Sequence, residues 1–256
     1  MTTELLTERI DHTLLITLSG PATRNALSPQ VYAAGVELLN VADADPEVRA
    51  VVITGHGGHF CGGGDLQRLA HLRTHDPAQQ ARHVEAFHRW VEALRSSPKP
   101  VIAAVEGVAA GGGLSLALAC DLVVASDSAR FVSAYSRVGL SSDGGCSWHL
   151  ARQLTRSQAL AWLWGGDERS AQQLQAAGLV HEVVPSGTAC TAALALAERL
   201  ALMPPAVAAS LKELVNDAPH QALGAHLQQE QKHFMQNLLA DEAGQAMGAF
   251  LQRKRR

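Results

Sequence analysis

Short, uninterrupted apolar runs are the main pattern of this chain, and a glycine-rich or polar turn follows most of them. The runs at 50–54 and 101–105 consist of β-branched and small apolar residues without alternating polar positions. Runs of this kind predict strands that are covered on both faces of a sheet. A similar run at 122–125 and a segment at 179–184, closed by Pro185, predict two more strands.

Helical patterns separate these strands. Ser28 followed by Pro29 predicts a helix start, because serine caps helices and proline suits the first helical position. At the N-terminus, two apolar segments around Asp11-His12 predict a hairpin. The polar stretch 74–78 contains a proline and predicts a loop between two helices. The expected helices in this part of the chain are 29–44, a helix from 66, 79–94, 114–120, 148–163 with a break near Thr155, and a short helix from Ser170.

After Pro185 the pattern is helical throughout, with segments at 188–202, 204–216, 219–239 and 241–252. Strands and helices alternate before that point. The chain therefore predicts an α/β core at 1–187 and a helical C-terminal region at 188–256. A strand, a glycine turn and a helix follow one another twice, as expected for a repeated ββα unit. The apolar residues of the last helices would fold back on the core or pack on a neighbouring subunit.

The composition is that of a folded globular protein: 256 residues, 47% hydrophobic and 18% charged. A net charge of −3 gives no reason to expect nucleic acid as a partner. No apolar run approaches the ~18–20 residues that span a membrane, and the N-terminus has no signal pattern. The four cysteines form no C-x-x-C pair and the histidines form no metal-binding motif. We therefore expect a cytoplasmic protein with reduced thiols, no metal and no membrane association.

Two glycine turns, Gly62-Gly63-Gly64 and Gly111-Gly112-Gly113, are the strongest candidates for chemistry. Each follows a predicted strand and precedes a predicted helix. The first N–H groups of a helix lack intrahelical partners, and glycine lets another molecule approach the backbone. Either turn alone is more often a tight turn. Together, two converging N–H donors make an oxyanion hole, which stabilises a carbonyl oxygen as it gains charge.

Several stretches carry a family resemblance by their order and spacing: Arg24-Asn25-Ala26-Leu27, 60–66 (FCGGGDL), 99–107 (KPVIAAVEG), 110–113 (AGGG), Cys120-Asp121 and Gly139-Leu140. On these motifs the chain resembles the enoyl-CoA hydratase/isomerase (crotonase) superfamily from end to end. The resemblance implies a crotonase-like ββα superhelix core and a coenzyme A thioester as substrate, with no separate cofactor. It also implies that the N–H groups of Gly64 and Gly112 hold the thioester oxygen. Members are commonly trimers or dimers of trimers, so we expect a homo-oligomer built through the C-terminal helices.

The same resemblance implies contacts to coenzyme A. Arg24 and Ala26 correspond to positions near its nucleotide end, and Gly62 and Leu66 to positions near its adenine. Phe234 and Arg253 correspond to C-terminal positions that reach coenzyme A, in some members across a subunit boundary. Arg253 also begins a basic run to residue 256, which could be only a solvated tail.

The reaction is less certain than the family, because two expected carboxylates are absent. Family hydratases use two glutamates, and this chain has Ser115 and Tyr135 at those positions. Serine and tyrosine hydroxyls are poor bases near pH 7. The resemblance therefore does not imply that this chain hydrates its substrate with two glutamates.

One carboxylate remains in the relevant loop, Asp143 in Gly-Leu-Ser-Ser-Asp-Gly-Gly at 139–145. An aspartate in this loop resembles enoyl-CoA isomerases of aromatic-acid breakdown, where it moves a proton. One acid/base is enough for isomerisation, because the same group removes a proton from one carbon and returns it to another. We therefore favour an isomerase or lyase acting on an unsaturated acyl-CoA from aromatic or fatty-acid degradation. The alternative for Asp143 is a cap on a helix that starts near Gly144 or Gly145.

Two other functions stay open. The loop also resembles 4-chlorobenzoyl-CoA dehalogenase, where the aspartate is a nucleophile, a histidine lies at the offset of His88 and a tryptophan replaces Tyr135. That suggests a dehalogenase or hydrolase using Asp143 and His88, although a lone helical histidine is more often structural or exposed. A non-catalytic crotonase-like protein that binds coenzyme A or RNA is the third possibility, which the acidic balance disfavours. We expect residues 67–90 and 131–150 to line the acyl pocket.

Overall fold

The computed structural model describes residues 2–253. Its main sheet has six strands in the order β1-β2-β3-β4-β6-β9, with an antiparallel β1–β2 hairpin and parallel pairs from β2 onwards. A second sheet has the order β5-β7-β8. The strands are β1 (Glu4–Ile10), β2 (Thr13–Ser19), β3 (Ala50–Gly55), β4 (Val101–Val105), β5 (Val108–Ala110), β6 (Leu122–Ser126), β7 (Arg130–Val132), β8 (Glu168–Ser170) and β9 (Glu182–Val184). The predicted hairpin and α/β class are confirmed.

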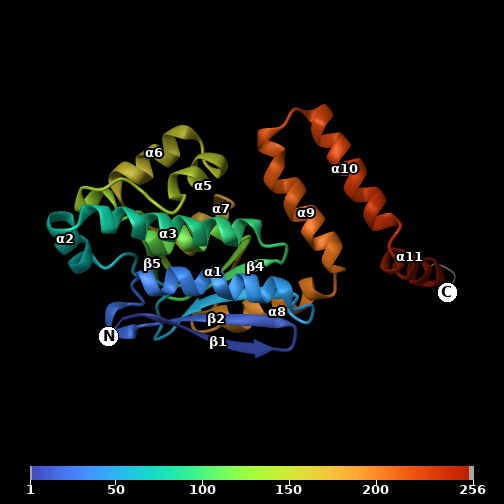
Figure 1. Cartoon of the computed structure of the whole chain (residues 1–256), viewed down its shortest axis with the longest axis horizontal. Helices are drawn as coiled ribbons and strands as arrows, with labels where there is room; N and C mark the ends of the chain where they lie inside the picture. Colours follow the sequence, from blue (N-terminus) through green and yellow to red (C-terminus); the bar gives the residue numbers. More distant parts are fainter. Residues whose placement is uncertain (1, 254–256) are drawn as a thin grey trace.

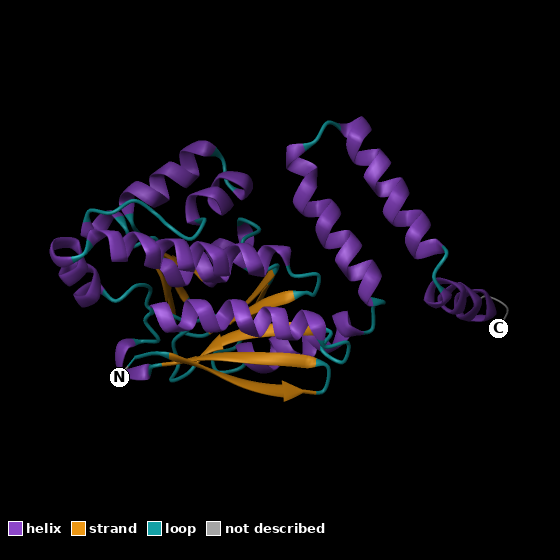
Figure 2. Cartoon of the chain, in the orientation of Figure 1, coloured by secondary structure: helices purple, strands orange, loops and turns teal. Residues whose placement is uncertain are grey.

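Helices cover both faces of the main sheet (Figure 2). The larger core lies between the sheet and helices α1 (Pro29–Ala44), α3 (Pro77–Ser96) and α4 (Gly112–Ala119). A smaller core lies between the other face and α8 (Ala189–Ala201). Every residue of β4 is buried, which explains why its sequence is uniformly apolar. Helix α8 packs on the sheet, and the helical arm that leaves the core follows it.

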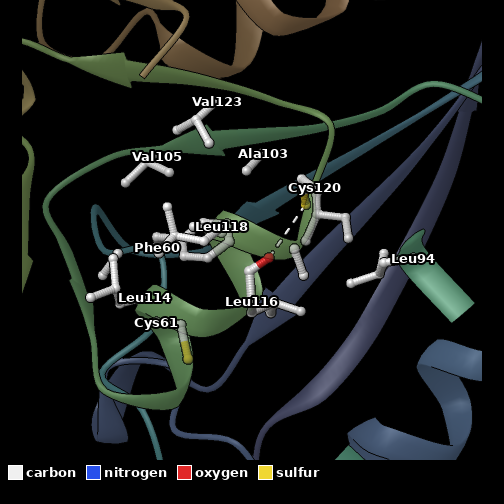
Figure 3. Packing of buried hydrophobic residues seen from close by; sticks show 14 of the residues in the cluster. Phe60, Cys61, Leu94, Ala103, Val105, Leu114, Leu116, Leu118, Cys120 and Val123 are labelled. Carbon is white, nitrogen blue, oxygen red and sulfur yellow. Dashed lines mark hydrogen bonds between the residues drawn. The ribbon is translucent and has the colours of Figure 1, made fainter. Parts of the chain in front are cut away.

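Helix α4 is buried along its whole length, and this fixes the position of the second glycine turn. Figure 3 shows Leu114 and Leu118 of α4 among Phe60, Val105 and Val123 from the sheet side of the core. Burying each large apolar side chain contributes roughly 1.5–3 kcal/mol. The N-terminus of α4 is therefore held by packing, not by a flexible loop.

Two local expectations were wrong in detail. Residues 74–78 are not a loop, because only Asp76 separates α2 (Leu66–His75) from α3. Asp76 Oδ1 accepts a 2.8 Å hydrogen bond from the Gln79 N–H, and Pro77 occupies the first turn, so α3 restarts at once. Ser28 precedes α1 as expected, but its side chain makes no capping hydrogen bond.

The remaining core helices agree with the predicted pattern. The break near Thr155 is confirmed, because Thr155 and Gln158 form a reciprocal capping box at the start of α6. Ser170 begins α7 with the same kind of box. These elements are α5 (Cys146–Gln153), α6 (Arg156–Gly165), α7 (Ala171–Ala176) and the 3₁₀ turns η1 (Pro21–Thr23), η2 (Ser136–Val138) and η3 (Ala218–His220).

An arm of three helices, α9 (Pro205–Asp217), α10 (Leu223–Leu238) and α11 (Asp241–Arg253), extends from the core (Figure 1). Lys212 of α9 ties it to the core through a 2.8 Å ion pair with Asp121. No residue of α10 is buried. In the described chain, no helix by itself has both the length and the apolar character to cross a bilayer. Helix α8 and the segment Pro205–His220 meet that condition only as a pair bent by 107°.

Candidate active site

The two glycine turns lie against each other. Cys61 pairs with Ala109 in a parallel bridge just before both turns. Gly63 has φ of +92°, and a Cβ there would lie 2.6 Å from the Ala110 carbonyl oxygen. A Cβ on Gly113 would overlap the Cys61 carbonyl oxygen. Only glycine permits this close approach of the two backbones.

The predicted oxyanion donors, Gly64 and Gly112, lie in these two turns. Gly112 is the first residue of α4, so its N–H has no intrahelical acceptor. Among the turn and loop hydrogen bonds of residues 2–253, none uses the N–H of Gly64 or Gly112. Both donors are therefore available to an oxygen that gains negative charge, and the dipole of α4 adds to their effect.

A third segment, residues 24–27, supports the first glycine turn. The Gly62 N–H donates to the Arg24 carbonyl and the Leu27 N–H donates to the Gly63 carbonyl, each at 2.7 Å. Buried Asn25 holds the segment in place, since its Nδ2 donates to the His59 carbonyl at 2.7 Å. The sequence motif contained Asn25, but its bracing role depends on contacts about 34 residues away and was not predicted.

Four of the expected coenzyme A positions lie along this segment and the first turn. Arg24 and Leu66 are exposed there, whereas Ala26 and Gly62 are half-buried. The two C-terminal positions lie on the arm. Phe234 is 65% exposed on α10, and Arg253 is the last residue of α11, with its side chain outside the described part of the chain. Within one chain, the first four positions are brought together and Phe234 is held on the separate arm (Figure 1).

Asp143 lies in a hydrogen-bonded network with Tyr135 and Ser115. The Tyr135 hydroxyl donates to Asp143 Oδ1 at 2.7 Å. The Ser115 and Tyr135 hydroxyl oxygens are also 2.7 Å apart, and Ser115 Oγ lies 2.9 Å from the Asp143 carbonyl oxygen. The two residues that stand where the family resemblance led us to expect glutamates thus contact Asp143, the one carboxylate residue of the loop. Asp143 does not cap α5, since Gly145 precedes that helix and no side chain caps it.

The direction of these hydrogen bonds follows from proton counting. Burial, and then the charge of Asp143, raise the pKa of Tyr135 far above its usual value, so its hydroxyl stays protonated. Because Tyr135 gives its one proton to Asp143 Oδ1, it cannot also donate to Ser115, whose own single proton faces both the Tyr135 hydroxyl oxygen and the Asp143 carbonyl oxygen. Asp143 Oδ2 has no hydrogen-bond partner among residues 2–253 and is not among the buried unpartnered atoms. One carboxylate oxygen is oriented, and the other is open to a substrate.

Phe87, Tyr32 and Leu27 form an apolar wall beside this network. A Cβ on Gly112 would lie 3.1 Å from Leu27 Cδ1 and 3.6 Å from the Phe87 ring. The rings of Phe87 and Tyr32 have centroids 5.3 Å apart. The wall was not predicted residue by residue, although Phe87 lies inside the 67–90 stretch expected to line the acyl pocket.

His88 projects to a different side of α3 from its neighbour Phe87. It is exposed and lines a cavity of about 690 Å³ together with Arg95, Trp148 and His149. This cavity lies between α3, α5 and α9, and Asp143 does not line it. No hydrogen bond joins His88 to Asp143 in the described part of the chain. His88 and Asp143 therefore form no hydrogen-bonded pair, although Gly144 and Gly145, which follow Asp143, line the same cavity as His88.

Comparison with known proteins adds the family context. The enoyl-CoA hydratase/isomerase family model matches residues 9–256. The chain is 34% identical over 251 residues to the 2,3-dehydroadipyl-CoA hydratase of Escherichia coli, covering 98% of this chain and 96% of that protein. It is 36% identical over 225 residues to the 1,2-epoxyphenylacetyl-CoA isomerase of the same bacterium, covering 86% and 84%.

Solved structures agree with this result over the whole fold. A crystal structure of an enoyl-CoA hydratase from a Polaromonas species is similar with a TM-score of 0.96 and 50% identity, covering 97% of each chain. An enoyl-CoA hydratase/isomerase structure from Mycobacterium abscessus follows with a TM-score of 0.92 and 32% identity, covering 98% of this chain and 97% of that one. The crotonase-like fold expected from the sequence motifs is confirmed.

Proposed function

Because the chain belongs to the enoyl-CoA hydratase/isomerase family, we propose that it moves a double bond within an enoyl-CoA thioester, with Asp143 as its acid and base. Membership makes it an enzyme that acts on CoA thioesters. Family membership does not determine which reaction the chain catalyses, since one relative is named a hydratase and the other an isomerase. The choice of isomerisation rests on the residues of the site.

The observation that carries this choice is the hydrogen bond from Tyr135 to Asp143 Oδ1. Hydration by two carboxylates needs a second acid/base to activate water. The groups beside Asp143 are two hydroxyls, and burial keeps Tyr135 from acting as a base. A single oriented carboxylate suits a reaction in which one group removes and returns the same proton.

The proposed steps follow from this geometry. The thioester oxygen lies between the N–H groups of Gly64 and Gly112. Asp143 Oδ2 takes a proton from the carbon next to the thioester, and the bonding electrons move into an enolate held by the two donors. The protonated Asp143 then gives the proton to the carbon at the far end of the double bond, which shifts the double bond into conjugation. Each oxyanion donor is worth roughly 10²–10³ in rate.

Coenzyme A would lie along the first glycine turn. Exposed Arg24 and Leu66, with the backbones of Ala26 and Gly62, offer a surface for its nucleotide end. Phe234 stands on the arm, so we propose that it and Arg253 reach this surface from a neighbouring copy of the chain. In that arrangement the homo-oligomer completes the site.

Asp143→Asn tests the proposal, because it keeps the shape of the side chain and removes the base. We expect the wild type to convert 3-enoyl-CoA to 2-enoyl-CoA thioesters and the variant to lose about 10²–10⁴ in kcat. Hydration of the 2-enoyl thioesters, followed in the same samples by loss of the conjugated chromophore, should be slow in both proteins. An unchanged melting temperature would show that the loss is chemical. Full isomerase activity in the variant would remove Asp143 from the mechanism.

A further inference from the structure

Arg68 is a cation beside the candidate active site that none of the steps above uses. It is half-buried on the first turn of α2, and its Nη2 donates a 2.9 Å hydrogen bond to the Leu27 carbonyl. Leu27 pairs with Gly64 in a parallel bridge, and its side chain lies close to Gly112. The guanidinium is therefore adjacent to the segment that carries the oxyanion donors.

No carboxylate of residues 2–253 forms an ion pair with this guanidinium. Its Nε–H is buried and has no hydrogen-bond partner. A buried donor without an acceptor costs free energy, and a partly buried charge without a counter-charge costs more. Such an arrangement is expected where a ligand supplies the missing anion.

Tyr32 links Arg68 to the catalytic end of the site. The charges of both Arg68 and Asp143 act on its hydroxyl. Burial raises the pKa of Tyr32 to about 12, so the hydroxyl remains a neutral donor. Its ring packs on Phe87, which lies against both Gly112 and Gly144. The polar group of Tyr32 thus lies on the same wall as the reacting centre.

Helix α3 continues this wall with more unpartnered polar atoms. Gln80, His83 and Phe87 follow one face of the helix, since they are spaced by three and four residues. His83 lies about 6 Å and Gln80 about 10 Å from Phe87 along the axis. His83 Nδ1 and Gln80 Oε1 are both buried without a partner. Burial, followed by Arg68, lowers the pKa of His83, which leaves Arg68 as the cation of the group.

We propose that Arg68, with Tyr32 and His83, binds a carboxylate at the far end of the acyl group, so that the substrate is the CoA thioester of a dicarboxylic acid. A guanidinium fork matches a carboxylate in two hydrogen bonds, and the neighbouring hydroxyl adds a third donor. Phe87 and Leu27 would contact the methylene or alkene carbons between the thioester and the carboxylate. The inference rests on the proposed function and adds the class of acyl group.

The test compares two enoyl-CoA thioesters of equal chain length, one ending in a carboxylate and one in a methyl group. We expect the wild type to show a kcat/KM at least about 10-fold higher for the carboxylate-ended thioester. Arg68→Met keeps the apolar stem of the side chain and should lower the preference by about 10- to 100-fold, the effect of losing hydrogen bonds to a charged group. Arg73→Met is the matched control, since Arg73 is exposed on the same helix and should leave the preference unchanged.

Arg68→Lys covers the possibility that the methionine variant does not fold. It retains the charge without the fork and should keep part of the preference. Equal kcat/KM values for the two thioesters in the wild type would overturn the inference and leave the proposed isomerase activity intact. An equal loss for both thioesters in Arg68→Met would overturn it as well. If the wild type isomerises neither thioester, the proposed function fails, and calorimetric binding of the two saturated analogues still decides whether Arg68 selects the carboxylate.

Discussion

The Tyr135 hydroxyl lies 2.7 Å from Asp143 Oδ1 and donates its proton to that oxygen. The Ser115 hydroxyl oxygen lies 2.7 Å from that of Tyr135 and 2.9 Å from the Asp143 carbonyl oxygen, so Ser115 supports both residues of this pair. These hydroxyls occupy the two positions at which the family resemblance led us to expect glutamates. In this chain both hydroxyls contact one carboxylate residue, Asp143, in the loop that follows.

Tyr135→Phe should lower kcat for 3-enoyl-CoA isomerisation by about 10- to 100-fold, because a hydrogen bond to a charged group is lost. KM should change little, since Tyr135 does not contact the proposed coenzyme A surface. Ser115→Ala, which acts one step further from Asp143, should have a smaller effect in the same steady-state assay. A phenylalanine variant with wild-type kcat would show that Asp143 needs no orienting donor.

The sequence predicted the elements whose cause is local. Uniformly apolar runs identified β3 and β4, and the two glycine turns come after these strands, the second directly after the short strand β5. Asp143 was recognised because the loop around it matches a family motif. Asp76 shows the limit of this approach. The sequence predicted a five-residue loop at 74–78, but in the structure Asp76 alone separates α2 from α3.

Contacts between segments that are distant in the sequence could not be predicted from such local patterns. Asn25 braces a turn more than 30 residues away, and Tyr32 meets Phe87 across two helices. Nothing in the spacing of Tyr32, Arg68 and Asp143 indicates that one hydroxyl faces two opposite charges. These relationships depend on how the helices pack on the sheet, and residue patterns describe only one helix at a time.

His88→Ala should retain kcat within about twofold of the wild type, because His88 is exposed and makes no hydrogen bond to Asp143 among residues 2–253. The measurement is the same isomerase assay at several pH values, since a catalytic histidine would also change the pH profile. Surface substitutions away from packing and charge networks usually change stability by less than about 0.5 kcal/mol, so the variant should fold normally. A loss of 10²-fold or more with normal folding would instead support the dehalogenase-like pairing of His88 with Asp143.

His149 should make the fold sensitive to acid. Burial, followed by the charges of Arg95 and Arg152, lowers its pKa from 6.5 to about 4. Because the folded-state pKa lies below the unfolded value, the unfolded chain binds the proton first, and stability is lost as the pH falls from about 6.5 towards 4. The loss attributable to this group is up to about 3 kcal/mol.

Urea unfolding of the wild type and of His149→Gln between pH 7 and 4.5 measures this contribution. Glutamine does not titrate, so the difference in unfolding free energy between the two proteins should shrink as the pH falls. A difference that stays constant across this range would show that His149 titrates equally in the folded and unfolded chains.

Gly113→Ala should damage both stability and activity. The added Cβ would overlap the Cys61 carbonyl, which belongs to the other glycine turn, so the two turns must separate. We expect a loss of roughly 1–3 kcal/mol in unfolding free energy and a lower kcat. Gly224→Ala is the control, because its Cβ would meet no atom within 4 Å on α10 and should leave both unchanged. An alanine tolerated at position 113 would mean that the turns need not be in close contact.

Leu227→Glu should reduce the size of the assembly measured by light scattering. Leu223, Leu227 and Phe234 follow one face of α10, with exposures of 73%, 51% and 65%. A stripe of this kind on an arm that stands off its own core is expected to be covered by another copy of the chain. A charge placed in it would then be buried without a partner, which strongly disfavours association. Gln228→Glu adds the same charge beside the stripe, on a polar, exposed position, and should leave the mass unchanged. If the wild type is already monomeric, the arm does not build the oligomer, and Phe234 cannot reach coenzyme A from a neighbouring chain.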